Sequence, residues 1–374
     1  MTKIVVFCDG TWNDPKIDEP TSIVDLHKVC INDPTRHQIT EYIPGVGTKT
    51  DQDATNQFDT KFQGTLKKYG GGAFGWGLDG KVKLAYQFIC QNYKKGDQIY
   101  LFGFSRGAFT ARSVAGMIRK CGLSKDVSVD GINKAYKLYQ KRWARNRPDE
   151  EHIMAARKDM SPKFSTSERD QNWRGDDGSE VVNLAYLGVL DTVGALGIPP
   201  LLFGGLGPVA MLWNRKYRFH DTELSSLVRS ARHAIAVDER RIVYQPSRWR
   251  NLRKLNGDQT GSLRPYQQTW FIGTHGILGG SFKDGHPLSV IPFAWVVRGA
   301  DSVAFENGSG VDDSIADPLF DHSELKEKGE FYKRWRSIPK DKDDIHKTVI
   351  ERMEAIEKYR PKTLAERLKS FFGG

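Results

Sequence analysis

The stretch from Gln98 to Arg112, QIYLFGFSRGAFTAR, joins an apolar run to a helical pattern and carries a serine at the junction. Its central residues, Gly103-Phe104-Ser105-Arg106-Gly107, match the pattern G-x-S-x-G. Between a strand and a helix this pattern is typical of a nucleophile elbow. There the two glycines, Gly103 and Gly107, let the chain reverse sharply and leave the serine hydroxyl exposed at the carboxyl edge of a sheet. The placement favours Ser105 as a nucleophile over an ordinary Gly-Ser turn.

The rest of the chain alternates between strand-like and helical patterns. We expect strands at 3–8, 38–43, 98–103, 182–190 and 268–273, and helices at 21–32, 80–94, 106–121, 132–146, 222–236, 287–299 and 342–358. This alternation predicts an α/β fold with a mainly parallel central sheet flanked by helices, and an active site at the carboxyl ends of the strands.

The charged segment at 122–180 interrupts the alternation. We interpret it as a helical insertion or cap within a catalytic domain at 1–310, which a basic, helical C-terminal extension at 311–374 follows. Within that extension, residues 364–372 place apolar side chains near helical spacing among basic ones. This pattern suits an interfacial helix, a helix docked on the domain or a partner-binding tail.

Two loops have unusual compositions. The glycine-rich stretch from Gly64 to Gly80 lacks the lysine and the serine or threonine that end a phosphate-binding loop, so we interpret it as a flexible loop near the site. The apolar stretch from Leu201 to Trp213 is broken by glycine and proline. Two interpretations fit it equally well: an internal loop packed on the core, and an apolar lip where acyl chains enter.

The composition, 39% hydrophobic and 27% charged, is that of a soluble globular protein. The formal net charge is +10, but lysine and arginine are scattered and no nucleic-acid motif accompanies them. We therefore expect no nucleic-acid partner, whereas a membrane surface of anionic phospholipid suits the charge as a partner.

The chain begins directly with a strand-like run, without a signal-peptide pattern, and no apolar run approaches the roughly 18 residues of a membrane span. We therefore expect synthesis in the cytoplasm. The cysteines are too widely spaced to indicate disulfides or a zinc motif: they are Cys8, Cys30, Cys90 and Cys121.

A serine nucleophile needs a base that a third group holds in place, and in α/β hydrolases the order along the chain is serine, acid, histidine. Asp191 directly follows the apolar run at 184–190, which favours it as the acid over a helix cap or turn residue. His275 follows the expected strand at 268–273 and opens a glycine-rich loop, so it is our first candidate for the base. His346, in the first turn of the expected terminal helix, is the runner-up.

An oxyanion hole needs two backbone N–H donors. We expect one from Arg106, the residue after the nucleophile, and the other from Gly10 or Thr11, which follow the first strand. Asp9 would orient this loop or the histidine rather than react.

Two rival chemistries fit less well. In the phosphatase motif D-x-D-G-T the nucleophilic aspartate would fall at Phe7, which excludes that reaction. A metal hydrolase assembled from Asp9, Asp191 and His275 has no tight ligand spacing to support it. We therefore expect neither a metal nor a cofactor.

Several separate stretches resemble one known family: Phe7 to Asn13 (D-G-T-W-N in the family), Gly75 to Leu78, Gly96-Asp97, Phe102 to Arg112, Asp191 to Ala195, Phe219 to Thr222, His233 to Arg241 and Trp270 to His275. Over most of residues 3–300 the chain resembles the α/β-hydrolase-like family of largely uncharacterised proteins that includes the first class of type VI secretion lipase effectors. The resemblance implies an ester hydrolase, a phospholipase in the secreted members, with Ser105, Asp191 and His275 as nucleophile, acid and base.

The resemblance also bears on partners and location. Delivery by a contractile injection apparatus needs no signal peptide. The absence of a signal-peptide pattern is therefore compatible with action in another cell or at a membrane surface. A secretion, immunity or regulatory protein would be the partner, and the sequence does not identify it.

One departure from the family pattern lies beside the expected base. The family continues its histidine motif as H-S-D-V-G-G-G, whereas the chain has His275-Gly276-Ile277-Leu278-Gly279-Gly280-Ser281, with Asp284 nearby. An apolar residue thus replaces a carboxylate. The leading hypothesis is a serine esterase that acts on lipids. The alternatives are a catalytically weak binding or scaffold protein with the same fold, and a hydrolase of non-lipid esters.

Overall fold

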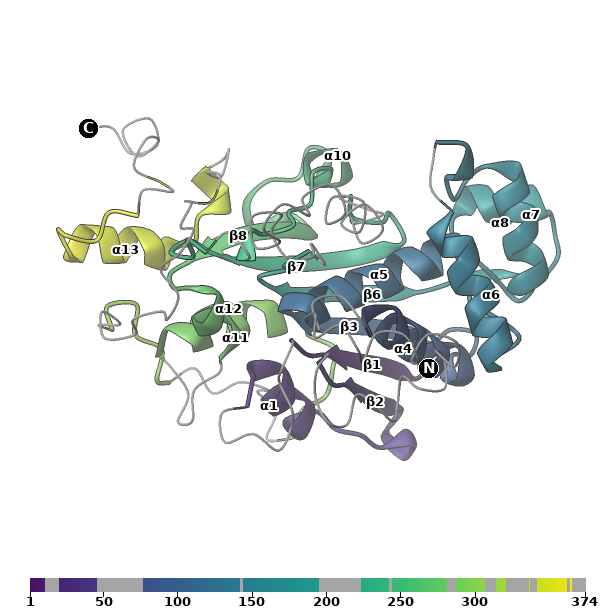
Figure 1. Cartoon of the computed structure of the whole chain (residues 1–374), viewed down its shortest axis with the longest axis horizontal. Helices are drawn as coiled ribbons and strands as arrows, with labels where there is room; N and C mark the ends of the chain where they lie inside the picture. The colour runs from purple at the N-terminus through teal and green to yellow at the C-terminus, as the bar shows by residue number, and fades with distance from the viewer. Residues whose placement is uncertain are drawn as a thin grey trace, which may run out of the picture.

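A six-stranded, fully parallel sheet forms the centre of the computed structural model (Figure 1). The structure describes residues 1–10, 20–45, 77–141, 144–194, 223–241, 244–280, 287–306, 314–320, 336, 342–361 and 364. Across the sheet the order is β2 (Gln38–Ile43), β1 (Lys3–Cys8), β3 (Gln98–Phe104), β6 (Leu184–Leu190), β7 (Val228–Ala236) and β8 (Tyr266–Phe271). The expected fold class is confirmed.

Helices cover both faces of this sheet. The main ones are α1 (Ser22–Val29), α4 (Leu78–Asn92), α5 (Ser105–Cys121), α11 (His275–Gly279), α12 (Pro287–Val297) and α13 (Lys347–Ala355). Successive strand residues point alternately into two apolar cores, one on each face of the sheet. Ile4, Val6 and Leu101 pack with α4 and α5 on one face, whereas Val5, Phe7 and Phe102 pack with α1 and α12 on the other. The strands read as apolar runs because both faces are covered.

The strand β7 corrects one expectation, the helix at 222–236. Val228, Ala231, Ala234 and Ile235 have the spacing of a helix face. In the fold this run pairs with β6 on one side and β8 on the other, and its last four residues are all buried. A strand buried on both faces needs no alternation of polar and apolar residues, so its pattern cannot be told from that of a helix.

The segment at 122–180 contains α6 (Val129–Gln140), α7 (Glu151–Met160), α8 (Glu168–Arg174) and the short parallel pair β4 (Phe164–Ser165) and β5 (Glu180–Val181). It is anchored by a buried ion pair between Arg157 and Asp170 (2.8 Å), and Arg157 also donates to the carbonyl of Lys120 at the end of α5. This is the end of α5 remote from Ser105, by the amino ends of the strands (Figure 1). The segment is a helical insertion, but its position is not that of a cap over Ser105.

Smaller elements connect the layers: the helix α10 (Leu252–Asn256) and the 3-10 turns Pro34–Arg36, Ala144–Asn146, Gly261–Leu263 and Lys342–Asp344. Of the loop expected at 64–80, residues 64–76 lie outside the described residues. The apolar stretch at 201–213 also lies outside them, as does the 364–372 tail apart from Leu364.

The described part of the C-terminal extension packs on the edge of the sheet. Ile345 forms a parallel bridge with Trp270 in β8, and Val349 and Met353 of α13 join the same apolar cluster as Trp270 and Ile277. These residues of 311–374 therefore share a core with the edge strand β8 and with Ile277.

A half-buried carboxylate ties this extension to the sheet. Asp238, just after β7, accepts hydrogen bonds from the Gly273 N–H (2.8 Å) and from the Tyr359 hydroxyl (3.0 Å). Burial raises the pKa of Asp238 to about 6, against the opposing effects of these two hydrogen bonds and of the nearby Arg352 and Arg240 charges. The folded protein therefore holds a proton on Asp238 that the unfolded chain loses at lower pH.

The close approach of α5 to β1 gives a first prediction. A Cβ added at Gly107 would lie 2.1 Å from the Cys8 carbonyl oxygen, whereas one at Gly116, also in α5, would come no closer than 3.4 Å to the Tyr139 ring. We expect Gly107→Ala to destabilise the fold by at least about 2 kcal/mol, since backbone must move. Gly116→Ala should be neutral or stabilising by about 0.5–1 kcal/mol. Urea denaturation of both variants measures this, and equal free energies of unfolding would contradict it.

Asp238 gives a second prediction. Its raised pKa means that the unfolded chain ionises first, so the wild type loses stability as pH rises from 3.8 to about 6 and keeps that loss at higher pH. Asp238→Asn removes the ionisation but retains an acceptor oxygen for Gly273. Between pH 4 and pH 7 the variant should gain about 2–3 kcal/mol relative to wild type.

Denaturant unfolding of both proteins across this pH range is the measurement. The difference at pH 4, where Asp238 is neutral in the folded protein and only the first part of the ionisation-linked loss has occurred, gives mainly the packing and hydrogen-bonding cost of the substitution. A difference that stays constant from pH 4 to pH 7 would contradict the assignment.

Candidate active site

Ser105 lies at the turn from β3 into α5, in a backbone conformation that few non-glycine residues adopt. Its φ is 56°, in the left-handed region, and the side chain is buried. A Cβ at Gly103 would lie 2.7 Å from the Cα of Ala108, so the residue two positions before the serine has to be glycine. The turn thus stores backbone strain that the packing of α5 on the sheet sustains.

Three strand ends bring the predicted residues together. Ser105 follows β3, Asp191 follows β6, and His275 opens α11 a few residues after β8. His275 Nε2 lies 2.8 Å from Ser105 Oγ, and His275 Nδ1 lies 2.6 Å from Asp191 Oδ2. The carboxyl ends of neighbouring parallel strands meet at one edge, and for this reason residues 84 and 170 positions apart can form one hydrogen-bonded chain.

Asp191 is fully buried, and its carboxylate oxygens accept hydrogen bonds from several donors. Besides His275, the Ala236 N–H donates to Oδ1 (3.1 Å), and the Arg336 guanidinium donates to Oδ1 (2.6 Å) and Oδ2 (2.8 Å). Burial by itself would raise the pKa of Asp191, but the Arg336 charge and the hydrogen bonds from His275 and Arg336 hold that pKa well below its usual range. The carboxylate is therefore ionised at neutral pH.

The imidazole of His275 is enclosed by aromatic rings. The ring of Tyr244 stacks on it at 4.5 Å, and the ring of Phe104 lies at 4.8 Å. The backbone N–H of His275 donates to Glu239 Oε2 (3.1 Å), a buried carboxylate that is paired with Arg241 (2.7 Å). Ring packing and this backbone bond together restrict the orientation of the imidazole. No sequence motif pointed to Tyr244 or Glu239 in this role.

The expected oxyanion loop is only partly described. Asp9 is buried, and its carboxylate accepts from the Thr21 hydroxyl (2.8 Å), the Tyr42 hydroxyl (2.7 Å) and the Gly10 N–H (2.6 Å). Asp9 therefore holds the backbone at Gly10, directly after β1. The Gly10 N–H donates to Asp9 in this structure, and Thr11 lies outside the described residues.

His346, the runner-up for the base, and His233 have different surroundings. His346 caps the N-terminus of α13, where its Nδ1 lies 2.8 Å from the Thr348 hydroxyl and its ring stacks on Phe271. Burial lowers the pKa of His346 to about 4. His233 lies in β7 and not in a helix, and burial lowers its pKa to about 3, so it is a neutral core residue that accepts from the Thr192 N–H (3.2 Å).

Ile277, which stands where the family has an aspartate, is buried among apolar side chains. Its neighbours in this cluster include Trp270 of β8 and Val349 of α13. At this position α11 therefore packs into the same apolar cluster as residues of α13. Asp284 lies outside the described residues.

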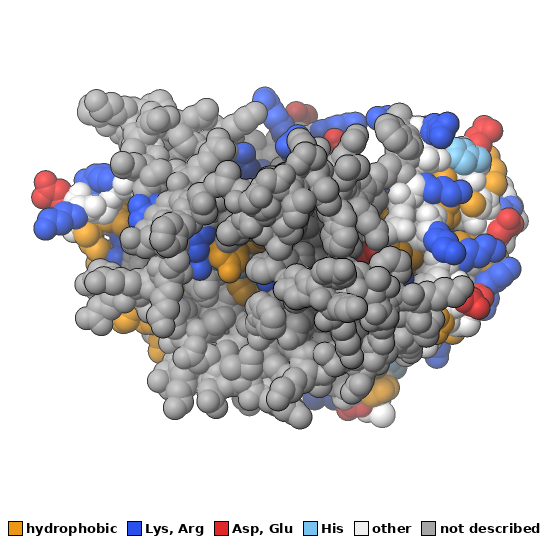
Figure 2. Space-filling view, viewed as in Figure 1, with side chains coloured by type: hydrophobic (Ala, Val, Ile, Leu, Met, Phe, Trp, Pro, Cys, Tyr) orange, Lys and Arg blue, Asp and Glu red, His pale blue; other side chains and the backbone are white. Residues whose placement is uncertain are grey.

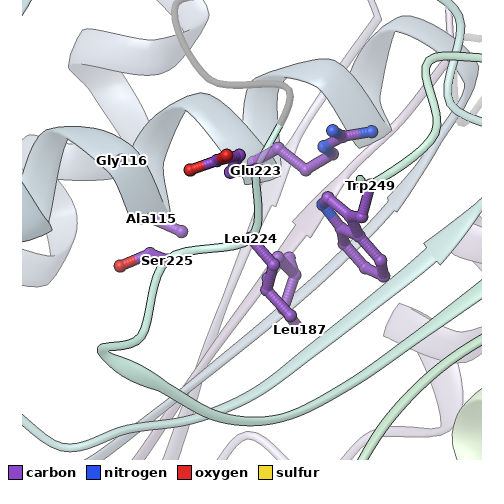
Figure 3. Close-up of a pocket in the computed structure, with 8 residues that line it drawn as sticks. Ala115, Gly116, Leu187, Glu223, Leu224, Ser225 and Trp249 are labelled. Carbon is purple, nitrogen blue, oxygen red and sulfur yellow. The ribbon is translucent and has the colours of Figure 1, made fainter. Parts of the chain in front are cut away.

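A small pocket lies along the middle of α5, away from the Ser105 end (Figure 3). It is lined by Arg112, Ala115, Gly116, Leu187, Glu223, Leu224, Ser225 and Trp249. Glu223 and Ser225 lie on the side of the pocket that faces the helix, and Leu224 and Trp249 line the opposite side. None of the three hydrogen-bonded residues of the site borders it.

The described residues also bear on metal binding, membrane spans, disulfides and surface charge. Within the described ranges, no three His, Cys, Asp or Glu side chains are grouped so that they could hold a metal ion, and no helix is both long and apolar enough to cross a bilayer. The four cysteines are free thiols. The surface over α6–α8 carries lysine and arginine interspersed with aspartate and glutamate, and is not a patch of one sign (Figure 2).

Known proteins resemble the chain over most of its length. An uncharacterised protein of Saccharomyces cerevisiae, YEL023C, is 28% identical over 241 residues, which are 64% of the chain and 31% of the yeast protein. A crystal structure of an uncharacterised protein from Pseudomonas aeruginosa matches 83% of the chain and 46% of its own, at 18% identity and a TM-score of 0.40. The Tle1 effector bound to the VgrG spike of the type 6 secretion system matches 75% of the chain and 51% of its own, at 17% identity and a TM-score of 0.36.

The chain spans less than a third of the yeast relative and about half of the two solved structures. Residues 2–299 match the family described as the type VI secretion system phospholipase effector Tle1-like catalytic domain. This match covers the strands of the central sheet and all three residues of the hydrogen-bonded chain. The protein therefore belongs to the family of Tle1-like phospholipase effector catalytic domains.

Proposed function

We propose that the chain is a serine hydrolase that cleaves carboxylic esters of phospholipids through Ser105, His275 and Asp191. The observation that carries the proposal is the unbroken hydrogen-bonded chain from Ser105 Oγ through the imidazole to a buried, ionised carboxylate. Membership of a phospholipase effector family supports lipid as the substrate class.

In the proposed reaction Ser105 Oγ attacks the ester carbonyl while His275 Nε2 takes the hydroxyl proton. The tetrahedral intermediate then expels the alcohol, which receives that proton from His275, and leaves an acyl group on Ser105. Water attacks the acyl-enzyme by the same route and releases the fatty acid. Asp191 accepts from His275 Nδ1, and so holds the tautomer in which Nε2 is the free base.

Charge on the carbonyl oxygen needs donors near the start of α5. The Arg106 N–H lies in the first turn of this helix, where the backbone dipoles favour an anion. The second donor would come from the loop after β1. Gly10 can serve only if its N–H turns from Asp9 to the substrate, and Thr11 is the other candidate. Each such donor contributes on the order of 3 kcal/mol.

The charge next to the nucleophile suits a phospholipid. Burial lowers the pKa of the Arg106 guanidinium to about 10, so it remains a cation at neutral pH. A phosphate near the scissile ester would meet this cation directly after the nucleophile in sequence.

We also propose, from the family alone, that the protein is delivered to another cell and meets a protein of the secretion apparatus on the way. Binding of the purified chain to a spike protein of a type VI secretion system would test this step separately from catalysis.

A fluorescent fluorophosphonate, which reacts with activated serines, tests the nucleophile and the base. Labelling should vanish in Ser105→Ala and fall by at least about a thousandfold in His275→Gln, because the serine loses its base. His346→Gln is the matched control. Since His346 caps α13, this variant should label at close to the wild-type rate but unfold more easily.

Vesicles of phosphatidylethanolamine and phosphatidylglycerol identify the bond that is cleaved. Mass spectrometry should show free fatty acid and lysophospholipid, with no headgroup released. Absence of labelling in a folded wild type, with and without vesicles, would contradict the proposal and favour a binding role. Equal losses of labelling in His275→Gln and His346→Gln would contradict the assignment of His275 as the base.

A further inference from the structure

Arg336 reaches the site from outside the part of the chain that defines the family. It lies 145 residues after Asp191 in sequence and beyond the matched residues 2–299. Its side chain is completely buried. One nitrogen of the guanidinium donates to Asp191 Oδ1 (2.6 Å) and to the Ala236 carbonyl (2.8 Å), and the other donates to Asp191 Oδ2 (2.8 Å) and to the Tyr244 carbonyl.

The two-point contact fixes the plane of the Asp191 carboxylate. A guanidinium that donates to both oxygens removes the freedom of the carboxylate to rotate, in a way that a single ammonium could not. Oδ2 is shared between Arg336 (2.8 Å) and His275 Nδ1 (2.6 Å), so the same contact sets the direction from which Asp191 meets the imidazole.

Arg336 also acts on the other side of the imidazole. Its bond to the Tyr244 carbonyl holds the backbone of the residue whose ring stacks on His275 at 4.5 Å. The guanidinium thus links the two groups that orient His275, the carboxylate at Nδ1 and the ring against its face.

The charge of Arg336 matters as much as its shape. A carboxylate buried as deeply as Asp191 takes up a proton unless a cation or several donors oppose it. A protonated Asp191 would offer an O–H where His275 needs an acceptor, and would release the imidazole from the tautomer used in the proposed reaction.

We propose that Arg336 is a positioning residue for catalysis: it keeps Asp191 ionised and in the plane that aligns His275 with Ser105. This inference rests on the proposed hydrolase function. It also means that the matched region needs a side chain from the C-terminal extension to complete its site.

Four proteins test the proposal: wild type, Arg336→Ala, Arg336→Lys and Arg352→Ala. Arg352 is the matched control because it is also a buried arginine of the C-terminal extension, but it donates to the carbonyls of Pro318 and Phe320. The measurements are kcat and KM on a water-soluble short-chain ester, the pH dependence of kcat/KM, and the fold as seen by near-ultraviolet circular dichroism.

We expect Arg336→Ala to lower kcat by about a hundredfold or more with KM changed only a few-fold, since a misaligned base affects the chemical step. The acid limb of its pH profile should move to higher pH, because Asp191 without its cation takes up a proton more readily. Guanidinium ion at millimolar concentration should restore part of the lost rate. Arg336→Lys should keep the wild-type acid limb with a several-fold lower kcat, and Arg352→Ala should keep the wild-type kcat.

A folded Arg336→Ala variant with the wild-type kcat and pH profile would overturn the proposal. A loss of kcat that guanidinium ion does not reverse and that Arg352→Ala shows as well would also overturn it. Should Arg336→Ala not fold, Arg336→Lys decides, since an unchanged kcat there would show that the two-point contact is not needed. A folded wild type without esterase activity would instead contradict the proposed function.

Discussion

A negative charge on a fully buried carboxylate is the constraint on which the site depends. Asp191 lies at the end of a central strand with no exposed surface, so its charge has to be balanced by the protein. The balance comes from parts of the chain that are far apart in sequence: the end of β7 through Ala236, the loop after β8 through His275, and the C-terminal extension through Arg336. Removing one of these partners would leave the buried charge less well compensated, so the geometry of the site and the stability of the fold are coupled here.

The parallel sheet makes this convergence possible, and the packing around it fixes the details. Gly103 and Gly107 allow α5 to lie so close to the sheet that Ser105 meets the imidazole at 2.8 Å. Apolar contact of Ile277 with the α13 cluster secures the loop that carries His275. The C-terminal extension therefore contributes twice to the site, through this apolar cluster and through Arg336.

The sequence predicted the features that local patterns encode. Apolar runs marked five of the six strands of the sheet, and polar residues directly after three of them pointed to Ser105, Asp191 and His275. The helical prediction for β7 was wrong because a strand buried on both faces has no alternation of its own. Arg336 could not be predicted, because it is one of 56 basic residues and its role depends on a contact across 145 positions that no local pattern records. For the same reason the stacking of Tyr244 on His275 left no signal in the sequence.

The proposed reaction depends most on the hydrogen bond from His275 Nδ1 to an ionised Asp191. The proton of this bond is observed most directly by nuclear magnetic resonance in water. It should give a far-downfield resonance that is protected from solvent exchange, persists in Ser105→Ala and disappears in His275→Gln. A folded protein without this resonance, or a resonance that survives in His275→Gln, would contradict the account.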